Sequence, residues 1–298
     1  MLIDKYGRPV KSLRVSLTSR CNLHCFYCHN EGQMATNHEM TADEIETLLK
    51  VARKLDIKRV KFTGGEPLLR HDIVDIVSRA SKYMEDVSIT TNGTLLAPLA
   101  KKLKAAGLNR INVSLDTVDR EKYEEITGED MLDKVLKGIK EAVAAELNPV
   151  KVNIVAILPL KKIMETIKTV WRLGAMPQII EMVNVENGDG DDISHIESYI
   201  ASRAIKVRHR HMHRRRIYTL LDDEGNEREI EVVRPIHNSA FCAACTRLRV
   251  TSDGKLKPCL MHNNGLVDVI TPIRKGVAME EIIKLFERAV ENRYPYWR

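Results

Sequence analysis

Aromatic residues make up only 5% of the 298 residues, and no apolar run approaches the roughly 20 residues that a membrane-spanning helix needs. The first ten residues also lack the apolar core of a signal peptide. With 44% hydrophobic and 30% charged residues, the composition argues against a disordered chain and suits a folded enzyme. We therefore expect a cytoplasmic protein with no membrane partner.

Cysteine is absent outside two groups of three, Cys21/Cys25/Cys28 and Cys242/Cys245/Cys259. Disulfides need pairs and an oxidising compartment, whereas each group has an odd number and the first is crowded into eight residues. Metal ligation is the better interpretation of both triplets.

Six short segments rich in Val and Ile have the pattern of buried strands, at residues 13–18, 59–63, 87–91, 110–115, 150–158 and 179–183. Helical patterns lie between them, at about 41–55, 72–84, 97–106, 131–146 and 160–173, and Thr41 with Glu44 forms a capping box before the first. This alternation predicts an α/β fold, a partial (β/α)6 TIM-like barrel with parallel strands. Active sites of such folds lie at the carboxyl ends of the strands, where Cys21 and the Gly64-Gly65 pair fall.

The pattern changes after about residue 190. A helix near 194–206 is followed by a basic stretch, by hairpins that turn at 222–226 and 252–254, and by an amphipathic helix near 279–291. We predict two domains, a partial barrel at 1–190 and a smaller α+β extension at 191–298 that carries the second triplet.

The first triplet has the spacing C-x3-C-x2-C, which lets one short loop bind three corners of a 4Fe–4S cluster and leaves the fourth iron open. The alternatives are a zinc site completed by His24 or His29 and a fully ligated electron-transfer cluster. Tyr27, an aromatic residue before the last cysteine, favours the open cluster over zinc.

This loop, Cys-Asn-Leu-His-Cys-Phe-Tyr-Cys at 21–28, resembles the signature of the radical S-adenosylmethionine (SAM) superfamily. The segment Phe-Thr-Gly-Gly-Glu-Pro-Leu at 62–68 resembles the GGEP element of the same superfamily, which hydrogen-bonds the amino group of SAM. The resemblance implies that one electron from the reduced cluster cleaves SAM, and that the resulting 5′-deoxyadenosyl radical abstracts a hydrogen atom from the substrate.

The second triplet is ambiguous on spacing alone. His262 lies three residues after Cys259 and could close a zinc site of the C-x2-C…C-x2-H type, while an open iron–sulfur cluster needs only the three thiolates. However, the segment 241–260 is similar to the GTP 3′,8-cyclase (MoaA) family of molybdenum cofactor biosynthesis. In that family the C-terminal triplet holds a second 4Fe–4S cluster whose open iron contacts the guanine, which would make His262 a bystander.

The resemblance extends over most of the chain, through Arg-Val-Ser-Leu-Thr at 14–18, Thr-Thr-Asn-Gly at 90–93, Arg-Ile-Asn-Val-Ser-Leu-Asp at 110–116 and Val-Lys-Val-Asn at 150–153. By position it implies that SAM contacts Tyr27, Gly65, Ser114 and Val183, although Met182 competes with Val183 for the last position. It also implies that GTP contacts Arg14, Lys61, Thr90, Lys151, Arg247, Leu248 and Arg249.

At three of these positions the strand pattern alone, without the family resemblance, also indicates a binding role for a basic residue. Arg14, Lys61 and Lys151 each occupy a position in an otherwise apolar strand, where an unpaired buried charge would cost several kcal/mol. A triphosphate is a sufficient counter-charge. The net charge of +6 permits an anionic ligand of this kind but does not by itself predict nucleic-acid binding, and we expect none.

The sequence departs from the family pattern in two places. Gln178 stands where the family often has a basic residue, and the last residues, 294–298, lack the Gly-Gly pair with which family members commonly end. The basic segment 206–216, with alternating Arg and His, is interpreted first as a solvated strand or helix end and second as a phosphate-facing element.

We therefore expect a radical SAM lyase that converts GTP to 3′,8-cyclo-7,8-dihydro-GTP, with two 4Fe–4S clusters and SAM as cofactors. Its expected partners are an electron donor, a downstream enzyme that forms the pyranopterin and, in a homodimer, a second copy of the chain. A radical SAM enzyme that modifies a peptide is the first alternative, and a zinc-stabilised nucleic-acid-binding module without catalysis is the second.

Overall fold

The computed structural model describes residues 1–36, 38–184 and 192–297. Its central feature is a curved sheet in which twelve strands are described, in the order β12-β11-β10-β1-β2-β3-β4-β5-β6-β9-β8-β7. The middle six are parallel neighbours: β1 (Ser12–Ser16), β2 (Arg59–Thr63), β3 (Asp86–Thr91), β4 (Arg110–Ser114), β5 (Val150–Val155) and β6 (Met176–Ile180). The predicted parallel six-stranded unit is confirmed.

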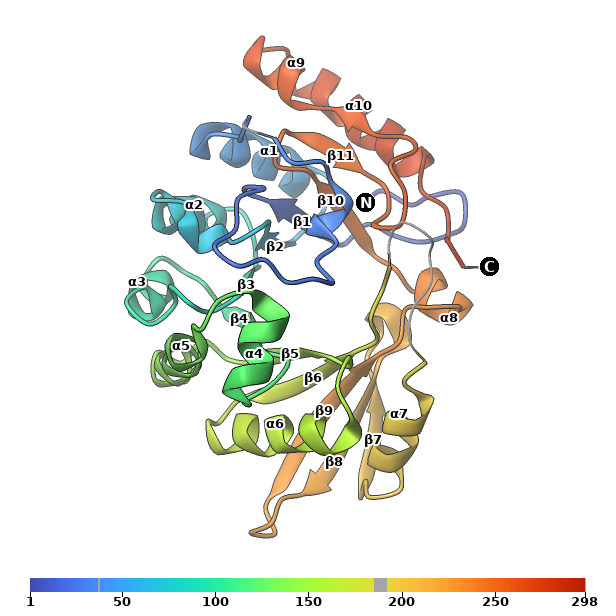
Figure 1. Ribbon diagram of the computed structural model, residues 1–298. Coiled ribbons are helices and arrows are strands. Elements are labelled where there is room, and N and C mark those ends of the chain that lie inside the picture. The colour runs from blue at the N-terminus through green and yellow to red at the C-terminus, as the bar shows by residue number, and fades with distance from the viewer. Residues whose placement is uncertain (37, 185–191, 298) are drawn as a thin grey trace.

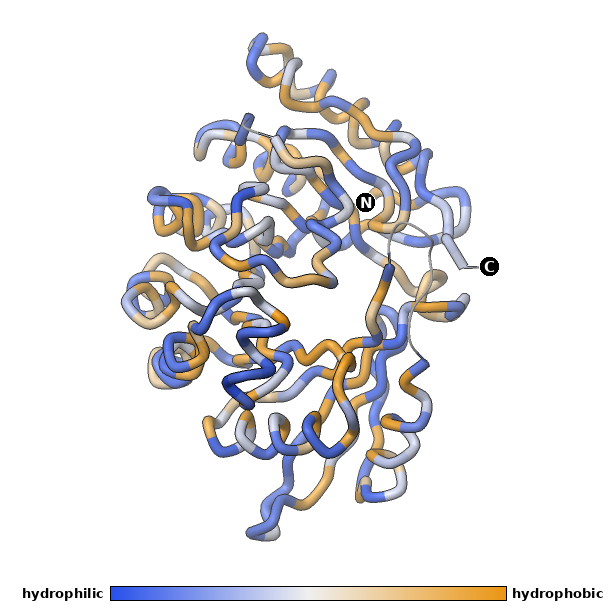
Figure 2. The backbone as a smooth tube through the Cα atoms, in the orientation of Figure 1, coloured by the Kyte–Doolittle hydropathy of each residue, from blue (hydrophilic) through white to orange (hydrophobic). Residues whose placement is uncertain are grey.

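Helices connect these strands, and five of them cover the outer side of the curve in Figure 1: α1 (Ala42–Lys54), α2 (Ile73–Ser81), α3 (Ala100–Ala105), α5 (Leu132–Ala144) and α6 (Leu160–Arg172). A further helix, α4 (Arg120–Thr127), lies against the first cysteine loop, where the carbonyl of Thr127 accepts the N–H of His24 at 2.8 Å. The predicted capping box of Thr41 and Glu44 is present at the start of α1. In Figure 2 the outer helices alternate between hydrophobic and hydrophilic along their turns, as expected for helices with one buried face.

Helix α4 is missing from the sequence prediction. It is strongly polar, and only Tyr123, Ile126 and Thr127 are buried, so it has no continuous apolar stripe. Its ends have capping residues that mark a helix: the Asp119 side chain accepts the N–H of Lys122 at the start, and Gly128 adopts φ of +79° at the end.

The C-terminal third of the chain extends both edges of the sheet. One edge gains β9 (Glu227–Val233), which is parallel to β6, then β8 (Arg216–Leu221) and β7 (Lys206–His209). The other edge gains β10 (Arg247–Val250), which is parallel to β1, then β11 (Lys255–Lys257) and β12 (Val267–Asp268). Both predicted hairpins are confirmed, as β8–β9 and β10–β11.

Four further helices accompany these strands: α7 (Ser194–Ala201), α8 (Ser239–Ala243), α9 (Ile270–Arg274) and α10 (Met279–Glu291). Helix α7 ends earlier than predicted because residue 206 already begins β7. The domain boundary predicted near 190 falls within 185–191, outside the described residues, so the division remains a prediction. In the part of the chain that is described, no helix is long and apolar enough to span a bilayer.

Alternation along the strands separates the core from the inner face. In β1, for example, Leu13 and Val15 are buried in the hydrophobic core, while Arg14 between them points to the inner side. The parallel arrangement brings the carboxyl ends of the strands, and the loops that follow them, to one rim of the sheet.

Candidate active site

All six cysteines line a single cavity of about 720 Å³ on the inner side of the sheet. The first triplet reaches it from the loop after β1, and the second reaches it from α8, from the residues before β10 and from the residues after β11. The cysteines are free thiols. The fold therefore brings together two triplets that are more than 200 residues apart in the sequence.

A close backbone approach positions the first triplet. The N–H of Gly65 donates to the carbonyl of Thr18 at 2.8 Å, and the N–H of Glu66 donates to that of Arg20 at 2.8 Å. A Cβ atom at Gly65 would lie 2.1 Å from the carbonyl oxygen of Arg20, so no other residue fits without displacing the chain that leads into Cys21. The Gly64-Gly65 pair thus lets the backbone after β2 pack directly against the start of the cysteine loop.

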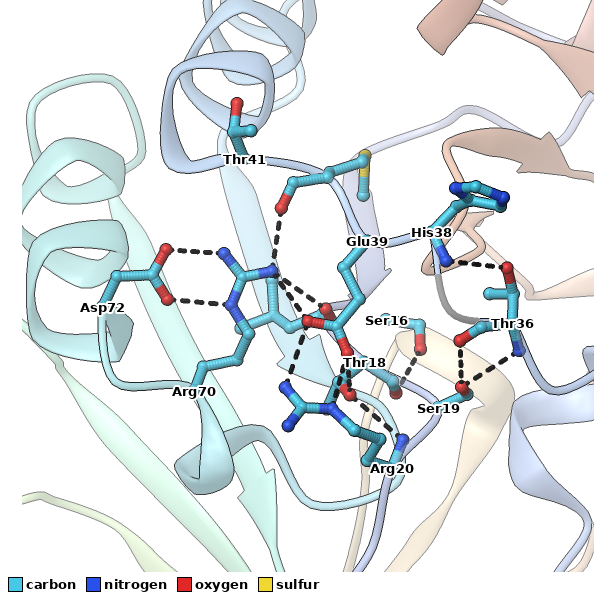
Figure 3. Close-up of polar contacts among 12 residues, drawn as sticks. Ser16, Thr18, Ser19, Arg20, Thr36, His38, Glu39, Thr41, Arg70 and Asp72 are labelled. Atoms are coloured by element: carbon cyan, nitrogen blue, oxygen red, sulfur yellow. Dashed lines mark hydrogen bonds and ion pairs between the residues drawn. The ribbon is translucent and has the colours of Figure 1, made fainter.

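Buried Arg70 contacts the segment that leads into the cysteine loop, and Figure 3 shows its polar contacts. Its guanidinium donates to the carbonyls of Leu17 (3.3 Å) and Met40 (2.8 Å) and makes a bidentate pair with Asp72 (2.8 and 2.6 Å). Glu39 lies beside it and accepts from Arg20 at 3.0 Å. These contacts tie the end of β1 to the start of α1 and fix where the cysteine loop begins.

Burial, together with charge repulsion from Asp116, Cys28 and Cys21, raises the pKa of the Cys25 thiol to about 12. Burial likewise raises the pKa of Cys21, with Cys28 contributing. Thiolates this close together are stable only beside a compensating cation, which a metal centre supplies. In the described residues, no three His, Cys, Asp or Glu side chains are gathered tightly enough for one metal ion.

The second triplet lies among guanidinium groups. Arg293 donates to the carbonyl of Cys245 at 2.7 Å, and Arg8 donates to that of Cys242 at 3.1 Å. Burial opposes ionisation of Cys245, but Arg293 and Arg247 lower its pKa below the ordinary value. The ring of His262 stacks on Tyr294 with the centroids 4.4 Å apart. Within this triplet Cys245 is thus shifted toward the thiolate, whereas burial raises the pKa of Cys242.

The four residues predicted to contact SAM, namely Tyr27, Gly65, Ser114 and Val183, all line the cavity. Val183, rather than its neighbour Met182, is the lining residue at that position. The hydroxyl of Tyr27 donates to the carboxylate of Asp116, which also accepts the N–H of Val155 at 2.7 Å. Burial raises the pKa of Asp116 to about 6.

Six of the seven residues predicted to contact GTP line the same cavity: Arg14, Lys61, Thr90, Lys151, Arg247 and Arg249. Leu248 differs, because its side chain is fully buried in the core, which leaves only its backbone available to a ligand. In the sheet register Arg14 stands between Arg249 on β10 and Lys61 on β2, so three basic side chains form a row.

Carboxylates that sequence reasoning missed compensate part of this charge. Glu31, three residues after Cys28, accepts from Arg14 and Arg249 at 2.5 Å each and from Thr63 at 2.9 Å. Glu231 on β9 pairs with Lys151. Neither Glu31 nor Glu231 belongs to a sequence motif that would predict a role in the site. The only sequence signal was that Glu31 lies close to the first triplet along the chain.

Positive charge nevertheless exceeds negative charge around the cavity. Among the described residues that line it, eleven are Lys or Arg and one, Glu31, is acidic. Burial lowers the pKa of Lys61 well below its ordinary value, and Arg110, Arg14, Arg247 and Arg215 lower it further. Lys61 has an amide partner, Asn112 at 2.6 Å, instead of a carboxylate. Such a site favours a polyanionic ligand.

The basic segment 206–216 divides into two parts. Residues 206–209 form the exposed strand β7, as predicted for a solvated strand. In the remainder the prediction of a solvated segment is wrong at His213, which is buried, and at Arg215, whose side chain is 10% exposed, whereas His211, Arg214 and Arg216 are exposed. The physical reason is a ring stack between His213 and Phe241 of α8, with centroids 3.9 Å apart, which draws the segment against the cavity.

Comparison with protein families gives two matches along the chain. Residues 15–170 match the model described as radical SAM superfamily, and residues 178–298 match the one described as Molybdenum Cofactor Synthesis C. Among curated proteins, the chain is 47% identical over 307 residues to a probable GTP 3′,8-cyclase of Pyrococcus abyssi, covering 100% of each. It is 44% identical to a probable GTP 3′,8-cyclase of Methanocaldococcus jannaschii, covering 99% of each.

Among solved structures, the chain is similar to Streptococcus suis SuiB bound to S-adenosylmethionine, with a TM-score of 0.68 and 18% identity. The similarity covers 89% of this chain and 64% of SuiB, so this chain spans about two thirds of that structure. The fold of the sheet and its helices is therefore shared with a protein whose sequence differs widely.

Proposed function

Because this chain belongs to the radical SAM superfamily and to its GTP 3′,8-cyclase family, we propose that it converts GTP to 3′,8-cyclo-7,8-dihydro-GTP. This is the first step of molybdenum cofactor biosynthesis, and the enzyme is a lyase. One observation carries the proposal: two cysteine triplets share a single cavity whose wall has a large excess of positive charge.

The first triplet, Cys21, Cys25 and Cys28, would hold the 4Fe–4S cluster that the superfamily requires, and this cluster would supply the electron that cleaves SAM. The second triplet, Cys242, Cys245 and Cys259, would hold a second 4Fe–4S cluster, which would supply an open iron to the substrate. Three thiolates without a fourth protein ligand fit both tasks, because each leaves one iron free for a small molecule. The free thiols and their shared cavity support this assignment.

When bound at the first cluster, SAM supplies a 5′-deoxyadenosyl radical that abstracts a hydrogen atom from the substrate. The role of this chain is to bind and orient SAM and the substrate and to exclude water from the cavity. The Gly64-Gly65 turn and Ser114 line the SAM side of the cavity, and Tyr27 is held by its hydrogen bond to Asp116. Arg14, Lys61 and Lys151 provide the charge that a triphosphate needs.

The chemistry also requires an electron donor and a downstream enzyme that forms the pyranopterin from the cyclised nucleotide. We propose both as partners, together with a second copy of the chain in a homodimer. The domain division near residue 190 belongs to the same proposal, with a C-terminal part whose strands β9 and β10 join the two edges of the parallel sheet.

Anaerobic incubation with SAM, dithionite and GTP tests the function. We expect 5′-deoxyadenosine and a new nucleotide in equal amounts. Cys25→Ser should form no deoxyadenosine, whereas Cys259→Ser should retain some uncoupled SAM cleavage and form no cyclised nucleotide. Cleavage of SAM without consumption of GTP by the wild-type protein would instead favour the peptide-modifying alternative.

A further inference from the structure

The part of the basic segment that faces the cavity has no role in the function proposed above. His211, Met212 and His213 line the cavity together with Arg210 and Arg215, and the N–H of Arg210 donates to the carbonyl of Arg215 at 2.9 Å. This bond closes residues 210–215 into a compact loop. The side chains of Arg210 and Arg215 therefore start from neighbouring positions at the base of the loop.

The loop is anchored to α8, the helix that carries Cys242 of the second triplet, and to the residue that precedes Cys245. His213 adopts φ of +63°, stacks its ring on Phe241 at an interplanar angle of 14°, and donates its N–H to the carbonyl of Ala244 at 3.2 Å. Phe241 directly precedes Cys242, and Ala244 directly precedes Cys245. The position of the loop is thus coupled to the second triplet, and its arginines are held at the cavity wall.

Both arginines converge on one carboxylate. A guanidinium nitrogen of Arg215 lies 3.0 Å from Oε1 of Glu231, one of Arg210 lies 3.4 Å from the same atom, and Lys151 pairs with Oε2. The Glu231 side chain is fully buried, and those of Lys151 and Arg215 are 6% and 10% exposed. Three cations thus share a single buried negative charge.

This charge imbalance is costly in the absence of another anion. Burying a cation without a matching negative charge is strongly unfavourable, and one carboxylate compensates only one of the two buried cations, Lys151 and Arg215, while Arg210 beside them is 30% exposed. In addition, Nε of Arg215 is buried without a hydrogen-bond partner among the described residues. The unused donor and the excess charge both indicate a place for an anionic group with several acceptor oxygens.

We propose that Arg210 and Arg215, together with Lys151, bind a phosphate group of the substrate, and that Glu231 is the counter-ion that holds the two arginines in place before the substrate arrives. The inference rests on the proposed function, since the substrate there is a nucleoside triphosphate. It adds a second anion subsite, built from β5, β9 and the 210–215 loop, to the one formed by Arg14, Lys61 and Arg249.

The test compares Arg210→Gln and Arg215→Gln with a matched control, Arg216→Gln. Arg216 follows directly in the sequence and carries the same charge, but it pairs with Glu197 at 3.1 Å and is 52% exposed. The holoenzyme and each variant are titrated anaerobically by calorimetry with three probes: GTP, guanosine and inorganic triphosphate. Iron content and far-UV circular dichroism confirm that each variant is folded and loaded.

We expect Arg210→Gln and Arg215→Gln to weaken binding of GTP and of inorganic triphosphate by about tenfold to hundredfold, the cost of losing charge-assisted hydrogen bonds. Guanosine affinity should change less than twofold, and Arg216→Gln should bind all three probes as the wild type does. Arg215→Lys, which keeps the charge, should recover part of the loss.

Two results separate the inference from the proposed function. If both glutamine variants bind GTP and triphosphate within twofold of the wild type, the subsite does not exist. If the wild type binds inorganic triphosphate through Arg210 and Arg215 but binds GTP no more tightly than inorganic triphosphate and does not bind guanosine, the subsite stands while the assignment of GTP as substrate fails.

Discussion

Replacing Gly65 with alanine tests how the sheet positions the first triplet. The new methyl group would lie 2.1 Å from the carbonyl oxygen of Arg20 and 2.9 Å from that of Ser19, both backbone atoms that cannot rotate away. Overpacking of this kind costs about 1–3 kcal/mol, and two backbone hydrogen bonds, from Gly65 and Glu66 to the cysteine loop, contribute about 1 kcal/mol each. We expect a destabilisation of roughly 3–5 kcal/mol, concentrated at this loop.

The assay is iron content and deoxyadenosine formation after anaerobic reconstitution. Gly65→Ala should lose the iron of one cubane while keeping that of the other, and SAM cleavage should fall at least a hundredfold. Gly276→Ala is the matched control, because Gly276 has φ of +66° but a methyl group there would meet no atom within 4 Å, so the change adds backbone strain without touching the loop. A Gly65→Ala protein with full iron and wild-type SAM cleavage would refute the reasoning.

Two further predictions concern buried carboxylates. Glu31→Ala leaves the guanidiniums of Arg14 and Arg249 without their carboxylate, so the unfolding free energy measured by chemical denaturation should fall by about 3 kcal/mol. Because GTP can replace the lost negative charge, it should raise the Tm of the variant more than that of the wild type. Equal Tm shifts for the two proteins would contradict a shared anion site. Burial raises the pKa of Glu66 from an ordinary 4.5 to about 7, so its contribution to stability is full below pH 4.5 and is lost as the pH rises through 7. Glu66→Gln should therefore flatten the decline of unfolding free energy between pH 4.5 and 7.5 by roughly 3 kcal/mol, and parallel profiles for the two proteins would show that Glu66 does not titrate there.

The parallel part of the fold follows from the sequence because its signals are local. Val- and Ile-rich strands, the capping box at Thr41 and the glycines after helices each act within a few residues, and all six central strands were predicted. Helix α4 was missed for the corresponding reason, since a mostly polar helix has no apolar period to detect. The joining of β9 and β10 to opposite edges of one sheet is a long-range pairing that no local pattern encodes.

The candidate site divides in the same way. The cysteines and the Gly64-Gly65 turn carry a spacing that predicts their chemistry, and the structure places them on one cavity. Glu31, Glu231 and the 210–215 loop depend on which side chains meet after folding, so the sequence offered no rule for pairing them with particular arginines. The stack of His213 on Phe241, two ordinary residues in isolation, decides where that loop lies.

The most direct test of two open clusters is metal analysis with spectroscopy of the anaerobically purified protein. We expect about eight irons per chain and no zinc, with SAM altering the electron paramagnetic resonance signal that Cys25→Ser removes, and GTP altering the signal that Cys259→Ser removes. A protein that contains one zinc ion per chain and about four irons, with a spectrum that does not respond to GTP, would contradict the proposal of two open clusters.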